Sequence, residues 1–311
     1  TIYTWLWTLL PISNVAWRVA LGEATAGALA CGLLGFVVSR GSSMMMEGIA
    51  DLKDIAKRWE NVICLVSGFV AGALLGFNGY MWSQSVIVEV YAFSVLSLMG
   101  VLVMLLRWMY APQQRRYLYW AFFIFGICFT NHQTLICAAM GIEIAIAAAD
   151  FRMGRSMFLW NSVAYLCGLI LHVKKLLFVD TNPMVFTIFH VVGICSIVAY
   201  VWFAVMTRIT VKEVTRDTLL ALGFFFCAML LNGLGLLFLL AGIAGAVYVN
   251  YQSKLTWEWS VSAFCGVLWG AGAAFYLYMA VAGMTCPPMQ WGYPRTVEGF
   301  FHALTRGQYE K

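Results

Sequence analysis

Long apolar runs separated by short polar segments fill the chain from about residue 15 to residue 285. A helix needs about 20 residues to cross a hydrocarbon core about 30 Å thick. The run 219–249 is too long for one comfortable span, and Asn232-Gly233 near its middle predicts a tight hairpin. Length arithmetic predicts an all-α, polytopic transmembrane helical bundle with roughly nine or ten membrane-crossing segments. The predicted crossings are residues 15–38, 62–77, 91–106, 119–130, 134–149, 158–172, 184–206, 219–249 and 259–284.

The amino-acid composition also predicts that this chain folds in a membrane. The chain is 62% hydrophobic and 11% charged, so it lacks the charged surface that a water-soluble fold of 311 residues needs. The net charge of +5 is small and gives no reason to expect nucleic-acid binding. The nine cysteines are scattered among apolar runs, which predicts packing residues. Because P-loop, HExxH and GxSxG motifs are absent, an ATP-driven or soluble-cofactor enzyme is disfavoured.

Three segments differ from the predicted bundle of residues 1–285. Residues 1–12 and about 44–60 predict interfacial helices, the second amphipathic. Residues 286–311 begin with a Pro-rich turn, after which Thr296 can cap a short helix starting at Val297. The chain starts at Thr1 and stops in mid-pattern, which predicts a piece of a longer protein.

The distribution of basic residues predicts the orientation in the membrane. Clusters around residues 40–58, 107–116, 152–155 and 208–216 fall in alternate loops, and the positive-inside rule places those loops in the cytoplasm. Residues 78–89, 131–133 and 174–183 then face outward, although Lys174 and Lys175 weaken the rule locally. If 219–249 is a hairpin, the tail from Cys286 also faces outward, as the start of a further extracytoplasmic segment.

Polar residues at membrane depth are candidates for function. Glu89 lies between apolar neighbours at the outer end of a crossing, where it either serves a site or caps the next helix. Asn131 and His132 precede Gln133 between two apolar runs, and form either a site or a helix-breaking corner. Arg18 can hold an anionic lipid or phosphate, snorkel to the interface, or pair with Glu23. His132 has no second metal-ligand residue at a suitable spacing, so the sequence does not support a metal site there.

Several segments resemble a known family: PISNVAWRVAL, GYMWSQSVIVEVYAF, GICFTNHQTL and PPMQWGYPRTVEGFFHALTRGQY. They are similar to a bacterial family of polytopic proteins related to a eukaryotic transmembrane protein O-mannosyltransferase. The resemblance covers most of the chain and implies a GT-C-like fold. Such enzymes transfer a sugar from a polyprenyl-phosphate carrier on the non-cytoplasmic side.

The resemblance also implies roles for particular residues. It makes Glu89 the catalytic candidate, positioning the acceptor or donor. It places substrate-binding residues at Arg18, Trp82, Gln84, Tyr91, Asn131, His132, Trp291 and Arg295. The family's first outer loop usually supplies a catalytic acid, and the stretch that carries it is absent before Thr1. No metal-binding residue is assigned, and the resemblance leaves open whether a divalent metal assists.

The sequence therefore predicts a multi-pass glycosyltransferase of the bacterial cytoplasmic membrane, with its active side outward. Its donor would be a polyprenyl-phosphate-linked mannose or similar hexose, and its acceptor a protein or glycan hydroxyl. The expected partners are membrane lipid, the lipid-linked sugar and, in one reading, other membrane subunits. The missing acid favours an alternative, a catalytically inactive GT-C-like subunit or scaffold. A transporter is a third reading, although no internal repeat supports it.

Overall fold

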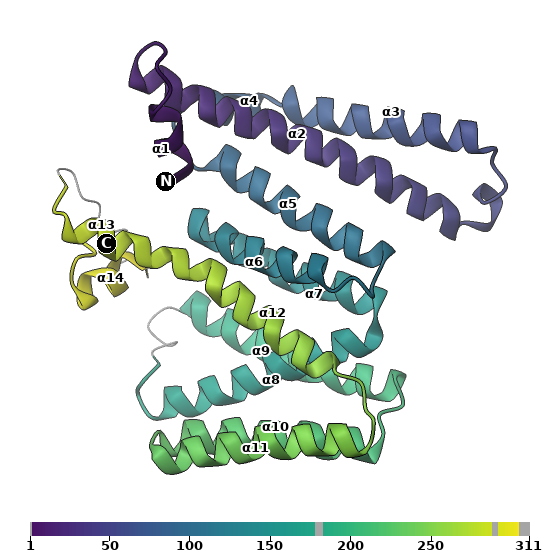
Figure 1. Ribbon diagram of the computed structural model, residues 1–311, viewed down its shortest axis with the longest axis vertical. Coiled ribbons are helices and arrows are strands. Elements are labelled where there is room, and N and C mark those ends of the chain that lie inside the picture. The colour runs from purple at the N-terminus through teal and green to yellow at the C-terminus, as the bar shows by residue number, and fades with distance from the viewer. Residues whose placement is uncertain (1, 178–182, 288–291, 305–311) are drawn as a thin grey trace. The chain divides into compact units, whose positions relative to one another are not determined.

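The structure is a computed structural model that describes residues 2–177, 183–287 and 292–304 (Figure 1). Its regular elements in those ranges are helices, so the prediction of an all-α bundle is confirmed. Within the described residues, seven helices are long and apolar enough to cross a membrane by length and composition. They are Val15–Gly48, Lys57–Gly76, Tyr91–Tyr110, Phe151–Val173, Val185–Met206, Gly233–Gln252 and Glu258–Met284.

The helices fall into two compact units. Unit 1 comprises Thr1–Ile136 and Cys265–Lys311, and unit 2 comprises Cys137–Phe264. The α-helices of the first 136 residues are α1 (Ile2–Thr8), α2 (Val15–Gly48), α3 (Lys57–Gly76), α4 (Gly79–Val86), α5 (Tyr91–Tyr110) and α6 (Arg116–Asn131). The later α-helices are α7 (Ala138–Ala149), α8 (Phe151–Val173), α9 (Pro183–Met206), α10 (Val211–Leu230), α11 (Gly233–Gln252), α12 (Glu258–Ala273), α13 (Leu277–Met284) and α14 (Val297–Leu304). Short 3₁₀ turns are η1 (Ala50–Leu52), η2 (Gln133–Cys137) and η3 (Ala274–Tyr276).

In unit 1, α2 packs along both α3 and α5, and α3 runs beside α2 in Figure 1. Glycines allow the first contact, because a Cβ added to Gly68 would lie 2.5 Å from the carbonyl oxygen of Gly35. Small residues of this kind let membrane helices approach closely, where van der Waals contact drives association. In the N-terminal half of α2, Ala26 and Ala30 form a buried cluster with Met81 and Ala92.

A second close approach in unit 1 joins α6 to the later part of α12. A Cβ on Gly126 would lie 2.1 Å from the carbonyl oxygen of Trp269, and one on Gly272 would lie 2.2 Å from that of Phe123. Nearby, the hydroxyl of Tyr276 donates a hydrogen bond of 3.2 Å to the carbonyl of Phe129. These contacts connect the C-terminal part of unit 1 to the helix that ends at the Asn131 corner.

In unit 2, α10 and α11 form the predicted hairpin and lie side by side in Figure 1. Leu231 turns the chain with a left-handed backbone (φ 49°), and the Asn232 side chain accepts a hydrogen bond of 3.0 Å from the Gly235 amide. Leu220, Ala246 and Trp259 make a buried cluster beside this hairpin. The predicted turn at Asn232-Gly233 is thus confirmed.

The structure differs from the sequence prediction in two stretches of unit 1. Residues 44–60 do not form one interfacial helix: α2 continues to Gly48, η1 follows, and α3 already begins at Lys57. At 34 residues, α2 is about 50 Å long, so it extends beyond a bilayer core. Residues 79–86, predicted as a link, form α4, whose first turn is capped by Asn78.

Candidate functional site

The Asn-His-Gln corner closes α6 and positions three polar side chains in unit 1. The helix ends because His132 takes an extended backbone (φ −147°, ψ 112°), while its amide still bonds the Cys128 carbonyl at 3.1 Å. The side-chain amide of Asn131 donates a hydrogen bond of 3.3 Å to the hydroxyl of Ser97 on α5. The corner therefore combines the Asn131–Ser97 hydrogen bond with a His132 residue that lies just beyond the end of α6.

Two predicted site residues from separate segments meet at this corner. The rings of Tyr91, at the first turn of α5, and His132 lie with centroids 5.5 Å apart and planes at 41°. The Nδ1 atom of His132 also hydrogen-bonds the hydroxyl of Thr134. The start of α5 and the Asn-His-Gln corner therefore lie side by side. We call Glu89, Tyr91, Asn131, His132 and Gln133 the polar corner.

Glu89 lies two residues before Tyr91 in the loop between α4 and α5. Its side chain is exposed and makes no hydrogen bond or ion pair with the residues that the structure describes. Its backbone amide bonds the carbonyl of Ile87 at 3.0 Å. The carboxylate is therefore available to a ligand and is not neutralised by a protein cation in the described part of the chain.

The α4 helix carries two further predicted residues. Trp82 is 59% exposed, whereas Gln84 is half-buried. The side-chain oxygen of Gln84 is buried and lacks a hydrogen-bond partner among the described residues. A buried polar atom without a partner is costly, so this oxygen is a position where a donor group would be stabilising.

Arg18 forms hydrogen bonds that connect α2 to the end of α1 and to the segment after it. Its Nη1 donates a hydrogen bond of 2.6 Å to the carbonyl of Thr8 and another to that of Leu10, and its Nε lies 3.4 Å from the carbonyl of Asn14. These bonds satisfy carbonyls at and beyond the end of α1, where a cation is favoured. Its predicted contact with a substrate phosphate stays a prediction.

Glu23 does not form the ion pair with Arg18 that their spacing permits. It is 2% exposed, and its Oε2 has no hydrogen-bond partner among the described residues. Tyr3 lies nearby and donates a hydrogen bond of 2.7 Å to the carbonyl of Gly22. Burial raises the pKa of Tyr3 above its ordinary value, a hydrogen bond with Trp7 lowers it, and the Glu23 carboxylate adds to the increase. Glu23 is thus a second acid, enclosed between α1 and α2.

A hydrogen bond joins the tail to the polar corner. The side-chain amide of Gln133 donates to the carbonyl of Leu304 at 2.6 Å. The helix α14 begins where predicted, since the Thr296 hydroxyl accepts a hydrogen bond of 3.0 Å from the Gly299 amide. Arg295 is exposed and lies 3.5 Å (Nη1) from Cys286 Sγ, while Trp291 lies outside the described residues.

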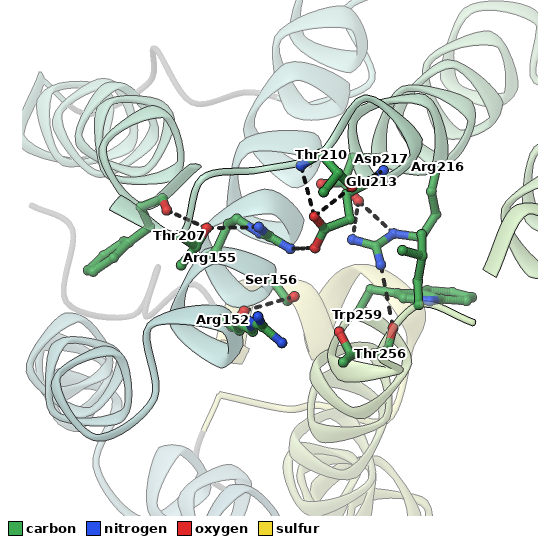
Figure 2. Close-up of polar contacts among 12 residues, drawn as sticks. Arg152, Arg155, Ser156, Thr207, Thr210, Glu213, Arg216, Asp217, Thr256 and Trp259 are labelled. Atoms are coloured by element: carbon green, nitrogen blue, oxygen red, sulfur yellow. Dashed lines mark hydrogen bonds and ion pairs between the residues drawn. The ribbon is translucent and has the colours of Figure 1, made fainter. Parts of the chain in front are cut away.

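Unit 2 contains a buried ionic cluster that the sequence did not predict (Figure 2). Arg155 of α8 bonds the carboxylate of Glu213 at 2.5 Å and the hydroxyl of Thr207 at 2.8 Å. On α10, Arg216 pairs with Asp217 at 2.7 Å. These four charged side chains are each at most 9% exposed as residues. Equal numbers of opposite charges keep the cluster neutral, which is how buried ions are tolerated.

Hydrogen bonds lower the pKa of Glu213. Its carboxylate lies in the polar first turn of α10, before the apolar part of that helix. Burial raises the pKa, but bonds from Thr210 and Arg155 outweigh that effect and bring it to about 2. The side chains of Thr210 and Glu213 also form a capping box, whose T-x-x-E signature is readable in the sequence.

Glu143, on α7, makes an interhelical contact. Its Oε2 accepts a hydrogen bond of 2.7 Å from the side-chain amide of Asn161 on α8. The described residues contain no group of three or more His, Cys, Asp or Glu side chains placed to hold a metal ion.

Residues 1–155 match the family model described as the protein O-mannosyl-transferase TMEM260 N-terminal domain. No curated protein and no solved structure matches the chain. The chain is an all-α membrane protein with multiple apolar helices, and this match relates its N-terminal half to the protein O-mannosyltransferase family. The matched part contains every predicted site residue except Trp291 and Arg295.

Proposed function

We propose that the chain is part of an integral membrane glycosyltransferase that transfers a sugar from a polyprenyl-phosphate carrier to a hydroxyl group. The observation that carries the proposal is the family match over residues 1–155. Within that part, the polar corner supplies the residue types that such a reaction uses. The preferred donor sugar is mannose or a similar hexose, and the acceptor is a protein or glycan.

The chemistry assigns different tasks to the groups of the polar corner. The acceptor oxygen attacks the anomeric carbon, its proton passes to a carboxylate, and the bond to the carrier phosphate breaks with its electron pair on the phosphate. Glu89, exposed and unpaired among the described residues, is suited to hold the attacking or donor hydroxyl. Tyr91 and His132, in ring contact, offer hydrogen bonds to the sugar or to the departing phosphate.

Orientation is a further part of the proposal. The reaction is assigned to the non-cytoplasmic side, because the loops carrying the polar corner alternate with the basic loops. The host membrane is assigned as a bacterial cytoplasmic membrane. The sugar-phosphate head of a membrane-anchored donor would meet the corner at the bilayer surface, so the donor needs no soluble carrier.

The direct test is sugar transfer by the purified, full-length protein in proteoliposomes. Radiolabelled polyprenyl-phosphate mannose is supplied with a Ser/Thr-rich peptide, and label in the peptide is measured. The proposal expects donor-dependent transfer that is lost after heat denaturation. A folded protein that transfers no label from this donor or from the glucose analogue would contradict it, and would favour the inactive-subunit alternative.

A further inference from the structure

An open groove runs between α2 and α3 in unit 1, with one end beside α4. Its volume is about 1220 Å³, and it follows the apolar parts of both helices. Among the described helices, α3 packs on α2 and, at its end, on α4. Figure 1 shows the two long helices side by side over most of their length. The residues that line the groove run from Ala24 to Ser43 on α2, a rise of about 28 Å, so the groove is long enough to hold an extended acyl chain.

The shape of the groove follows from the placement of glycines on α2. On the packed side, Gly35 approaches Gly68 so closely that neither position has room for a Cβ. One turn away, Gly32 lines the groove, and a Cβ added there meets nothing within 4 Å. Phe36 and Phe69 stand along the walls. The helices thus touch along one row and leave an apolar channel along the next.

One end of the groove is polar, and its lining holds two cations, Arg40 and Lys57, and one carboxylate, Glu60. Lys57 pairs with Glu60 at 2.8 Å, and the hydroxyl of Ser43 donates to the same carboxylate at 2.7 Å. Arg40 also lines this end, with its guanidinium 5.7 Å from the centroid of the Phe36 ring. Arg40 has no carboxylate within ion-pair distance among the described residues, so its guanidinium is available to an anion at this end.

We propose that this groove binds one membrane phospholipid with an anionic headgroup. An acyl chain lies along the apolar channel past Gly32, and the phosphate lies at Arg40. A guanidinium suits phosphate because it presents a planar set of donors, and cations beside a bilayer attract anionic lipids. The walls are the antiparallel helices α2 and α3, in which Gly35 meets Gly68 and Cys31 meets Gly72, so the channel is elongated like an acyl chain.

This lipid is distinct from the donor of the proposed reaction. Arg40 lies 22 residues after Arg18 on one continuous helix, a rise of about 33 Å, which is close to the thickness of a bilayer core. The headgroup site is therefore at the membrane face opposite the N-terminal end of α2. The proposal holds or fails whether or not the chain transfers sugar.

Native mass spectrometry of the full-length protein with phosphatidylglycerol or phosphatidylcholine tests the proposal. Gly32→Leu fills the groove, and Gly41→Leu is its matched control, because Gly41 has equal room on the same helix but does not line the groove. Wild type and Gly41→Leu should retain one phosphatidylglycerol. Gly32→Leu should weaken binding about tenfold or more, the change expected when two methylene groups leave an apolar site.

The headgroup contact is tested with a second pair of variants. Arg40→Gln should lower the preference for phosphatidylglycerol over phosphatidylcholine about fivefold, whereas Arg58→Gln, outside the groove lining, should leave it unchanged. Equal binding of the two lipids by wild type would overturn the proposal. Equal retention by Gly32→Leu and Gly41→Leu, with matching thermal stabilities, would also overturn it, as would a lipid-free dimer in which the groove is covered by a second copy.

Discussion

The side-chain amide of Gln133 donates a hydrogen bond to the backbone carbonyl of Leu304, with 2.6 Å between Nε2 and the oxygen. This bond connects the corner after α6 to the last turn of α14, although the two segments are far apart in the sequence. An unsatisfied carbonyl at a helix C-terminus gains from a side-chain donor. The end of the tail helix is therefore bonded to a residue of the Asn-His-Gln motif.

Replacing Gln133 by Ala should loosen α14 without unfolding unit 1. One neutral hydrogen bond contributes about 1 kcal/mol, so the docked population should fall and the bundle should persist. A nitroxide label at position 303 should show an added mobile component in its spectrum. Asn131→Ala is the control, since it removes the bond to Ser97 and leaves the Gln133 bond intact. Unchanged label mobility in Gln133→Ala would show that other contacts hold the helix.

Replacing Arg155 by Met should strongly destabilise unit 2. The change leaves the buried Glu213 carboxylate without its cation, and breaking a buried pair from one side costs about 3–5 kcal/mol. Thermal unfolding in detergent should show a lowered Tm. Arg152→Met is the matched control, because that exposed side chain takes no part in the ion pairs. The double variant Arg155→Met with Glu213→Gln should recover part of the lost Tm. Equal Tm values for Arg155→Met and Arg152→Met would refute a stabilising role of the Arg155–Glu213 ion pair.

The Arg155–Glu213 pair should make the thermal stability of the protein fall at acidic pH. The folded-state pKa of Glu213 is about 2, below its ordinary value of 4.5, so its contribution is fully present above pH 4.5. That contribution is lost as pH falls through 4.5 toward 2. The Tm advantage of wild type over Glu213→Gln should be constant between pH 5 and 7 and shrink toward pH 2. An advantage that persists unchanged to pH 2 would contradict this account.

The predicted orientation can be tested by cysteine labelling in intact cells. A cysteine at exposed Ser83 should react with a membrane-impermeant thiol reagent, whereas one at exposed Gln114 should react only after lysis. The exposed native thiols Cys137, Cys195 and Cys286 are first replaced by serine. Labelling of position 114 alone in intact cells would invert the proposed topology.

Local signals explain what the sequence predicted well. The Asn232-Gly233 hairpin and the helix after Thr296 depend on capping and turn chemistry within a few residues, so they could be located from the local sequence. The α4 helix was missed although Asn78 is a good N-cap, because its eight residues are too few and too polar for a crossing.

Long-range pairing explains what the sequence could not give. Arg155 and Glu213 lie on α8 and α10, and the sequence alone could assign Arg155 only to a basic loop. The family resemblance assigned Arg18 to the substrate, and the sequence could not show that its guanidinium donates hydrogen bonds to carbonyls around the end of α1. In contrast, Tyr91 and His132 were grouped by motif, and their rings do meet.

The most direct measurement compares initial rates of sugar transfer by Glu89→Gln and Glu47→Gln in proteoliposomes with polyprenyl-phosphate mannose. Both acids are exposed, but Glu47 lies near the end of α2, away from the polar corner in sequence. The account predicts that Glu89→Gln lowers the rate about 100-fold or more, as loss of a group that handles the reacting proton or hydroxyl should. Glu47→Gln should match wild type. A Glu89→Gln protein that inserts normally and transfers sugar within about twofold of wild type would contradict the central claim.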